Sequence, residues 1–126
     1  MSRDVIHASN APAAAGPYSH AIVANGFVFT AGQVGIVPAA KALAEGGIQG
    51  QTRQALDNIR AVLEAAGTSL DRVVKTTVFL ANIGDFAAMN EVYATYFPSQ
   101  PPARTTIQAG ALPMGALVEV EVVAVL

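Results

Sequence analysis

The stretch PPARTTIQAGALPMGALVEVEVVAVL, residues 101–126, decides how this chain folds. Within it, residues 117–125 alternate between the two faces of a predicted strand. One face is aliphatic, whereas the other carries the carboxylates of Glu119 and Glu121 among apolar neighbours. An unpaired carboxylate in apolar surroundings has a raised pKa, which suits a group that transfers protons near neutral pH. The strand alone leaves open whether this face meets solvent at a sheet edge or lines a site.

Working outward from this stretch, the apolar patterns predict more strands and two helices. The Asn25-Gly26 pair is a hairpin signal between two short apolar strands. Apolar residues recur at steps of three and four over residues 48–66, which predicts an amphipathic helix. VVKTTVFL, Val73–Leu80, is typical of a strand buried on both faces, and a second helix is predicted from Asp85 to about residue 97.

Each predicted helix has one apolar face and one polar face. On the first helix, Asn58 belongs to the polar side, which we expect to face solvent. On the second helix, Asn90 lies next to the apolar face, where its amide needs hydrogen-bond partners. The residues that share this apolar face are predicted to enter the core: Phe86, Met89, Tyr93, Tyr96 and Phe97.

The order of these elements predicts one α+β domain over residues 1–126, with two helices on one face of a mixed β-sheet. No further segment is available to cover the other face of the sheet. Charged residues make up only 13% of the chain, against roughly 25% in a typical soluble domain. We therefore expect a neighbouring subunit to cover that face in a symmetric oligomer.

Composition excludes several classes of function. The net charge is −2 and the seven basic residues are scattered, which argues against nucleic-acid binding. Cysteine is absent, and the only histidines, His7 and His20, share no ligand spacing with a third donor, so we predict no metal site. His20 is expected to be a hydrogen-bonded structural residue. Without an apolar run of roughly 20 residues or a signal-peptide core, the expectation is a soluble cytoplasmic protein with no membrane partner.

Motifs along essentially the whole chain resemble those of the RidA/YjgF family of imine deaminases. They are GPYSHA at 16–21, FTAGQVG at 29–35, QTRQALDNIRAVLEAAG at 51–67, PPART at 101–105 and LPMGALVEVEVVAV at 112–125. The resemblance implies a chorismate-mutase-like fold and a homotrimer with clefts between subunits. It also implies cofactor-independent hydrolysis of reactive 2-imino acids, such as 2-iminobutanoate and 2-iminopropanoate, to 2-oxo acids and ammonia. These imino acids are products of pyridoxal-phosphate-dependent dehydratases.

The resemblance also assigns roles to residues that the alternation alone leaves equivalent. By analogy with the family, Arg104 binds the substrate carboxylate and Glu119, rather than Glu121, prepares the attacking water. Tyr18 of the GPY motif closes the cleft, and Asn90 matches a family asparagine near the site.

Two positions depart from the commoner family pattern. The backbone of Gly32 and Thr106 is expected to help hold the carboxylate, but Thr106 stands where many members carry cysteine. Ala31 stands where many carry serine, so a hydroxyl that pairs with a polar ligand is missing. Two alternatives therefore remain beside imine hydrolysis. One is a non-catalytic trimer that binds small carboxylates in the same cleft, and the other is a deaminase for a different enamine or aminoacrylate.

Overall fold

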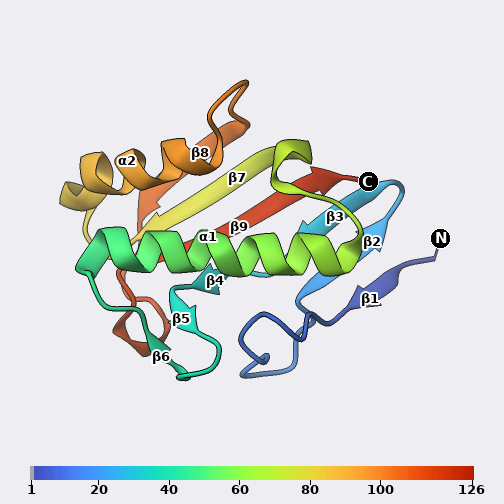
Figure 1. Ribbon diagram of the computed structural model, residues 1–126, viewed down its shortest axis with the longest axis horizontal. Coiled ribbons are helices and arrows are strands. Elements are labelled where there is room, and N and C mark those ends of the chain that lie inside the picture. Colours follow the sequence, from blue (N-terminus) through green and yellow to red (C-terminus); the bar gives the residue numbers. More distant parts are fainter. Residues whose placement is uncertain (1) are drawn as a thin grey trace.

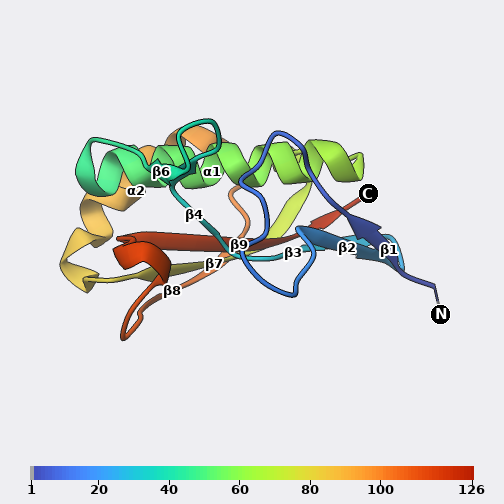
Figure 2. The same ribbon diagram turned by 90° about the horizontal axis from the view of Figure 1, so that it is seen from below.

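Both long helices lie on the same face of one mixed β-sheet in the computed structural model, which describes residues 2–126 (Figure 1 and Figure 2). The helices are α1 (Gly47–Ala66) and α2 (Phe86–Tyr96). The sheet runs in the order β1 (Asp4–Ile6), β2 (Ala21–Ala24), β3 (Phe27–Thr30), β9 (Val118–Val125), β7 (Val73–Leu80) and β8 (Ala103–Gln108). This arrangement confirms the predicted α+β architecture.

The strand β9 lies at the centre of this sheet. It pairs antiparallel with β3 and with the short β4 (Gln33–Val34) on one side, and antiparallel with β7 on the other. The strands β7 and β8 are parallel, and α2 forms the connection between them. As a result, β8 is an edge strand and its residues lie at the border of the sheet.

The hydrophobic core lies between α1 and the sheet. On β9, every second residue is buried against the helices, which confirms the predicted alternation: Val118, Val120, Val122 and Ala124. The face of α1 that meets them includes Leu56, Ile59 and Leu63, all fully buried. None of the helices within residues 2–126 combines the length and the hydropathy that crossing a bilayer requires.

The prediction that Asn58 faces solvent is wrong, because this side chain is 1% exposed. Its amide Nδ2 donates hydrogen bonds to the carbonyl oxygens of Val34, at 3.1 Å, and Ile36, at 2.9 Å. The chain that leaves β4 passes along this side of α1, and its carbonyl groups need donors once they are buried. A polar helix residue can thus be buried where it faces the backbone carbonyl groups of a neighbouring segment instead of solvent.

The sheet face opposite the helices, here called the free face, is covered by no helix or strand of the described residues. The prediction that β7 is buried on both faces is therefore wrong for the single chain. Its residues alternate between buried positions such as Val78 and partly exposed positions such as Phe79. Large apolar side chains remain on the free face, with Phe27 39%, Phe29 47% and Ile107 46% exposed. Such a surface is typical of an interface with another chain.

Candidate functional site

Arg104 lies on the edge strand β8, on the sheet face that the helices cover. Its strand partner is Thr76, which is fully buried on that face. The carbon at the centre of the Arg104 guanidinium lies 4.6 Å from the ring centroid of Tyr93 and 5.5 Å from that of Phe86. Both rings belong to α2, so the helix supplies aromatic faces that attract the cation and restrict its orientation. No ion pair neutralises Arg104 among residues 2–126.

The Tyr93 ring is itself held in place. Its hydroxyl is hydrogen-bonded to Oγ1 of Thr76 at 2.8 Å, which ties α2 to β7 behind the arginine. Burial raises the pKa of Tyr93, so the phenol stays protonated at neutral pH. The prediction that Phe86 enters the core is wrong. This ring is 41% exposed and lies near Arg104 at the start of α2.

A cavity of about 370 Å³ opens in front of Arg104, between α2 and the segment that leads into β8. It is lined by Asn90, Tyr93, Ala94, Phe97, Pro101, Pro102 and Arg104. Within the described chain, two buried side-chain atoms have no hydrogen-bond partner, Oδ1 of Asn90 and Oγ1 of Thr106. Thr106 follows Arg104 by two positions on the same face of β8. Since buried polar atoms are normally paired, the free acceptor of Asn90 and the free hydroxyl of Thr106, near a cation without an ion-pair partner, indicate a site for an anion that also carries a hydrogen-bond donor.

Glu119 lies on β9, on the free face of the sheet, where it pairs with Phe79 of β7. Its side chain is partly buried, and this burial raises the pKa of its carboxyl group. The negative charge of Glu121 raises the pKa of Glu119 further, although by less than burial does. A carboxylate with a raised pKa is a better proton acceptor than an ordinary exposed glutamate.

The segment between β3 and β4 runs directly against this carboxylate. A Cβ atom at Gly32 would lie 2.6 Å from Oε2 of Glu119, so only glycine fits without displacing the carboxylate. The neighbouring Ala31 donates its backbone N–H to the carbonyl oxygen of His20 at 2.9 Å. This bond places the GPYSHA segment beside Ala31 and Gly32.

Tyr18 lies on that segment and is 47% exposed. Its hydroxyl accepts a hydrogen bond from the backbone N–H of Ala15 at 3.2 Å. The Tyr18 hydroxyl is therefore bonded to its own loop, and not to Arg104 or Glu119. The role in cleft closure that the resemblance implies for Tyr18 therefore stays a prediction.

The predicted site residues form two groups in the chain. The Arg104 group contains Arg104, Asn90, Thr106 and the rings of Tyr93 and Phe86. The Glu119 group contains Glu119, Gly32 and Ala31, with Tyr18 on the adjoining loop.

The sheet separates these two groups. Side chains that pair across neighbouring strands point to the same face, and successive side chains along one strand point to opposite faces. On β7, Thr76 pairs with Arg104, whereas Phe79 pairs with Glu119. Because Thr76 and Phe79 are an odd number of positions apart, Arg104 and Glu119 lie on opposite faces of the sheet. One chain therefore does not present both side chains to one ligand.

The two aromatic rings and Thr76 were not predicted as parts of the site. Phe86 and Tyr93 are seven residues apart, which is two helical turns, so they share a face of α2. The sequence shows this spacing, but an apolar face on a helix is expected to enter the core. Only the position of Arg104 on the next strand distinguishes a ring that holds a cation from a ring that fills the interior.

Comparisons with known proteins agree with this architecture. The family model described as endoribonuclease L-PSP matches residues 8–126. The chain is 46% identical over 123 residues to the 2-iminobutanoate/2-iminopropanoate deaminase of Mus musculus, covering 98% of this chain and 91% of that protein.

Two solved structures are similar over their whole length. The protein YyfA of Yersinia pestis, a member of the conserved Rid protein family, is 49% identical with a TM-score of 0.95, covering 99% of this chain and 100% of that one. TdcF of E. coli with bound serine is 35% identical with a TM-score of 0.93, covering 98% of each chain. Together with the match to the family model, these similarities confirm the resemblance found in the motifs: the chain belongs to the RidA/YjgF family.

Proposed function

We propose that this protein hydrolyses 2-imino acids to 2-oxo acids and ammonia, in clefts that two subunits share. Relatives named as a 2-iminobutanoate/2-iminopropanoate deaminase and as a reactive intermediate deaminase support the general reaction. The observation that carries the proposal is the cation of Arg104, which is held between two rings, has no ion-pair partner, and lies beside two unpaired polar atoms. A 2-imino acid has a carboxylate for such a cation and an electrophilic carbon for water.

The Arg104 group binds the substrate in this proposal. The planar guanidinium meets the carboxylate through two parallel hydrogen bonds, and the hydroxyl of Thr106 donates a third. Oδ1 of Asn90 accepts a hydrogen bond from the imine N–H. The related TdcF structure contains serine, a ligand that also has a carboxylate and a nitrogen attached to the same carbon.

Glu119 activates the water. Its carboxylate takes a proton as the water oxygen forms a bond to C2 and the C=N π electrons move to nitrogen. The proton then passes to that nitrogen, which gives an intermediate with an amino group and a hydroxyl group on C2. The C2 hydroxyl next gives up its own proton, which the same carboxylate carries to nitrogen as the C2–N bond breaks, so that ammonia leaves and the 2-oxo acid remains. Because imine hydrolysis already proceeds in water, orientation and one general base suffice for acceleration.

The placement of the two groups on opposite sheet faces supports a cleft that is shared between subunits. The cleft forms when the β8 edge of one copy meets the free face of the next, so that Arg104 of one copy meets Glu119 of its neighbour. These surfaces differ, and a contact between unlike surfaces closes into a ring when its rotation permits. The trimer implied by the family resemblance is such a ring, and it covers Phe29 and the other apolar side chains of the free face.

Subunit mixing tests this arrangement directly. Arg104→Ala and Glu119→Gln proteins, each inactive alone, are denatured together in equal amounts and refolded. In any mixed ring of three, one interface joins an intact Arg104 to an intact Glu119, so about one quarter of wild-type activity should return. If both groups served one site within a chain, mixing would restore none. Native mass spectrometry of the same samples should show three times the chain mass of 12.9 kDa.

The reaction itself is tested by generating 2-iminobutanoate with threonine dehydratase and following 2-oxobutanoate release with and without this protein. Faster release supports the proposal. Unchanged release with measurable 2-oxo acid binding favours the non-catalytic carboxylate-binding trimer, for which the absence of a hydroxyl at Ala31 is the specific observation. A panel of enamines and aminoacrylates tests the second alternative. We do not propose RNA as a substrate, because the net charge of −2 does not favour binding to a phosphate backbone.

Glu121→Gln should move the pH dependence of deamination. The charge of Glu121 raises the pKa of Glu119, so its removal lowers that pKa. Glu119 acts as a base only when ionised, hence kcat/KM rises with pH through its pKa. The rising limb of the pH profile of the variant should therefore lie at lower pH than that of the wild type. A limb that does not move would show that another group controls it.

Gly32→Ala should lower kcat while leaving the fold intact. The added Cβ would displace the Glu119 carboxylate, which it would approach to 2.6 Å. A displacement of this size moves the base out of line with the water, and about a hundredfold loss is expected. The matched control is Gly110→Ala, since nothing lies within 4 Å of a Cβ at that position. Equal activity of the two variants would contradict the placement of Gly32 against the base.

A further inference from the structure

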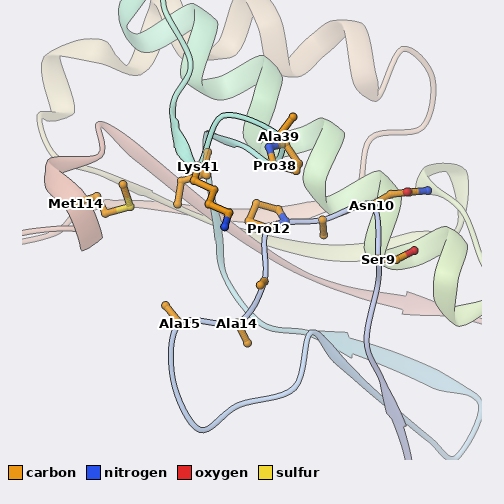
Figure 3. Close-up of a pocket in the computed structure, with 12 residues that line it drawn as sticks. Ser9, Asn10, Pro12, Ala14, Ala15, Pro38, Ala39, Lys41 and Met114 are labelled. Atoms are coloured by element: carbon orange, nitrogen blue, oxygen red, sulfur yellow. The ribbon is translucent and has the colours of Figure 1, made fainter.

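A second cavity is lined by none of the predicted site residues, although its lining residue Ala15 is hydrogen-bonded to the Tyr18 hydroxyl. Its volume is about 790 Å³, which is within the range of about 300–1,000 Å³ for small-molecule sites. One wall is the loop of residues 9–15, the opposite wall is the hairpin of β5 (Ile36–Val37) and β6 (Ala42–Leu43), and Met114 lies at one end (Figure 3). Neither Arg104 nor Glu119 lines it.

The loop wall is fixed by side-chain hydrogen bonds. Nδ1 of His20 accepts a hydrogen bond from the backbone N–H of Ala8 at 2.8 Å, and Nε2 donates one to the carbonyl oxygen of Pro12 at 2.8 Å. This confirms the structural role predicted for His20, which is 3% exposed. At the other end of the loop, the Tyr18 hydroxyl holds the backbone N–H of Ala15. A pocket whose walls are held in this way loses little conformational entropy when a ligand binds.

Lys41 lies on the hairpin wall with a backbone φ of 54°, in the left-handed region that long side chains rarely adopt. Its backbone N–H is bonded to the carbonyl oxygen of Val37 at 2.8 Å, which holds the turn in this conformation. Met114 has a similar φ of 58° at the end of the same cavity. Residues held in such conformations cluster at ligand sites.

The chemistry of the lining is simple. Alanine and proline make up most of it, Ile36 and Met114 add larger apolar surface, and Lys41 is its one charged residue. The side chain of Lys41 extends from the hairpin toward the loop (Figure 3). The described lining contains no carboxylate. Within residues 2–126, Lys41 forms no ion pair, so its ammonium group is not neutralised.

We propose that this cavity is a second ligand site, which binds a small amphiphilic carboxylate independently of the imine site. The apolar body of the ligand packs against Pro12, Ile36 and Met114, and its carboxylate pairs with Lys41. A single lysine matches one negative charge, whereas a phosphate or a nucleotide needs several donors around its oxygens. A neutral apolar ligand would gain nothing from the lysine.

The test is calorimetric titration of the intact protein with naphthylacetate and with its neutral analogue naphthylacetamide. The Arg104→Ala variant is used as the background, since it lacks the carboxylate site of the imine cleft. Naphthylacetate should still bind this variant. Adding Lys41→Gln should weaken naphthylacetate about fivefold and leave naphthylacetamide unchanged, as expected for one partly exposed ion pair. The control Arg53→Gln removes an equal charge from an exposed position of α1 and should change neither affinity.

Ala13→Trp gives an independent readout, because it fills the cavity from an exposed lining position. It should weaken both ligands and leave imine hydrolysis unchanged. The proposal is overturned if Arg104→Ala abolishes naphthylacetate binding, since the ligand then occupies the imine cleft. It is also overturned if Lys41→Gln behaves like Arg53→Gln, or if Ala13→Trp leaves both affinities intact. Because these results do not depend on turnover, they separate this proposal from the imine reaction.

Discussion

Replacing Arg104 by alanine is expected to lower kcat/KM for 2-iminobutanoate by about a hundredfold or more, as the loss of a charged pair with a ligand typically does. The guanidinium is the cation of the proposed site, and it lies over the rings of Tyr93 and Phe86. Alanine removes both the charge and the fork geometry. The dehydratase-coupled assay measures the loss, and calorimetry with 2-oxobutanoate should show a matching loss of affinity.

Arg104→Lys separates charge from geometry. Lysine keeps the positive charge but cannot form two parallel hydrogen bonds, so its kcat/KM should fall between those of the wild type and the alanine variant. The fold should survive both changes, because the stacking that is lost contributes only about 0.5–1 kcal/mol at partly exposed sites. Arg53→Ala is the control for an equal change in net charge. Unchanged kcat/KM in Arg104→Ala would refute the assignment of this residue.

Replacing Glu119 by glutamine should lower kcat by about 10²–10⁴, the usual contribution of a general base. Glutamine has nearly the same shape but accepts no proton from water. Binding of 2-oxobutanoate should be retained, since the carboxylate is held by Arg104. The control is Glu121→Gln, which should keep turnover while shifting its pH dependence. If Glu121→Gln abolished turnover and Glu119→Gln did not, the acids would be assigned in the wrong order.

Glu119→Gln should lower activity without lowering the thermal stability of the fold. The folded chain binds a proton at Glu119 more tightly than the unfolded chain does, because burial raises the pKa. The stability that this group contributes is complete below its unfolded pKa and is lost as pH rises through the raised folded pKa. Above that folded pKa the ionised side chain therefore gives no such contribution, and in that pH range glutamine should leave Tm unchanged or higher. A marked fall in Tm would mean that the carboxylate is paired in the assembled protein.

Local patterns predicted the fold well. The alternation in residues 117–125 follows from the two-residue repeat of any strand, and it assigned Val120 to the core and Glu119 to the other face. The helices and the Asn25-Gly26 hairpin likewise depend on short-range spacing and turn chemistry. Such features need no knowledge of the neighbouring strands.

The arrangement of the site depends on contacts that spacing does not encode. Arg104 and Glu119 are placed by the register of β7 with β8 and of β7 with β9, and register is a property of the whole sheet. The burial of Asn58 depends on where a distant segment passes. The position of Phe86 beside a cation depends on the same tertiary arrangement, so its apolar character alone indicated the core.

The separation of Arg104 from Glu119 by the sheet has a consequence for the life of the protein after synthesis. If the cleft is shared between subunits as proposed, a newly made chain carries both halves of the cleft but no complete cleft. Catalysis would begin only when chains encounter one another, so specific activity should fall on dilution below the dissociation constant of the assembly. After a jump to higher concentration, product release should show a lag with the time course of assembly. Total activity in the cell would thus rise more than twofold when the protein concentration doubles, as long as the assembly is partly dissociated.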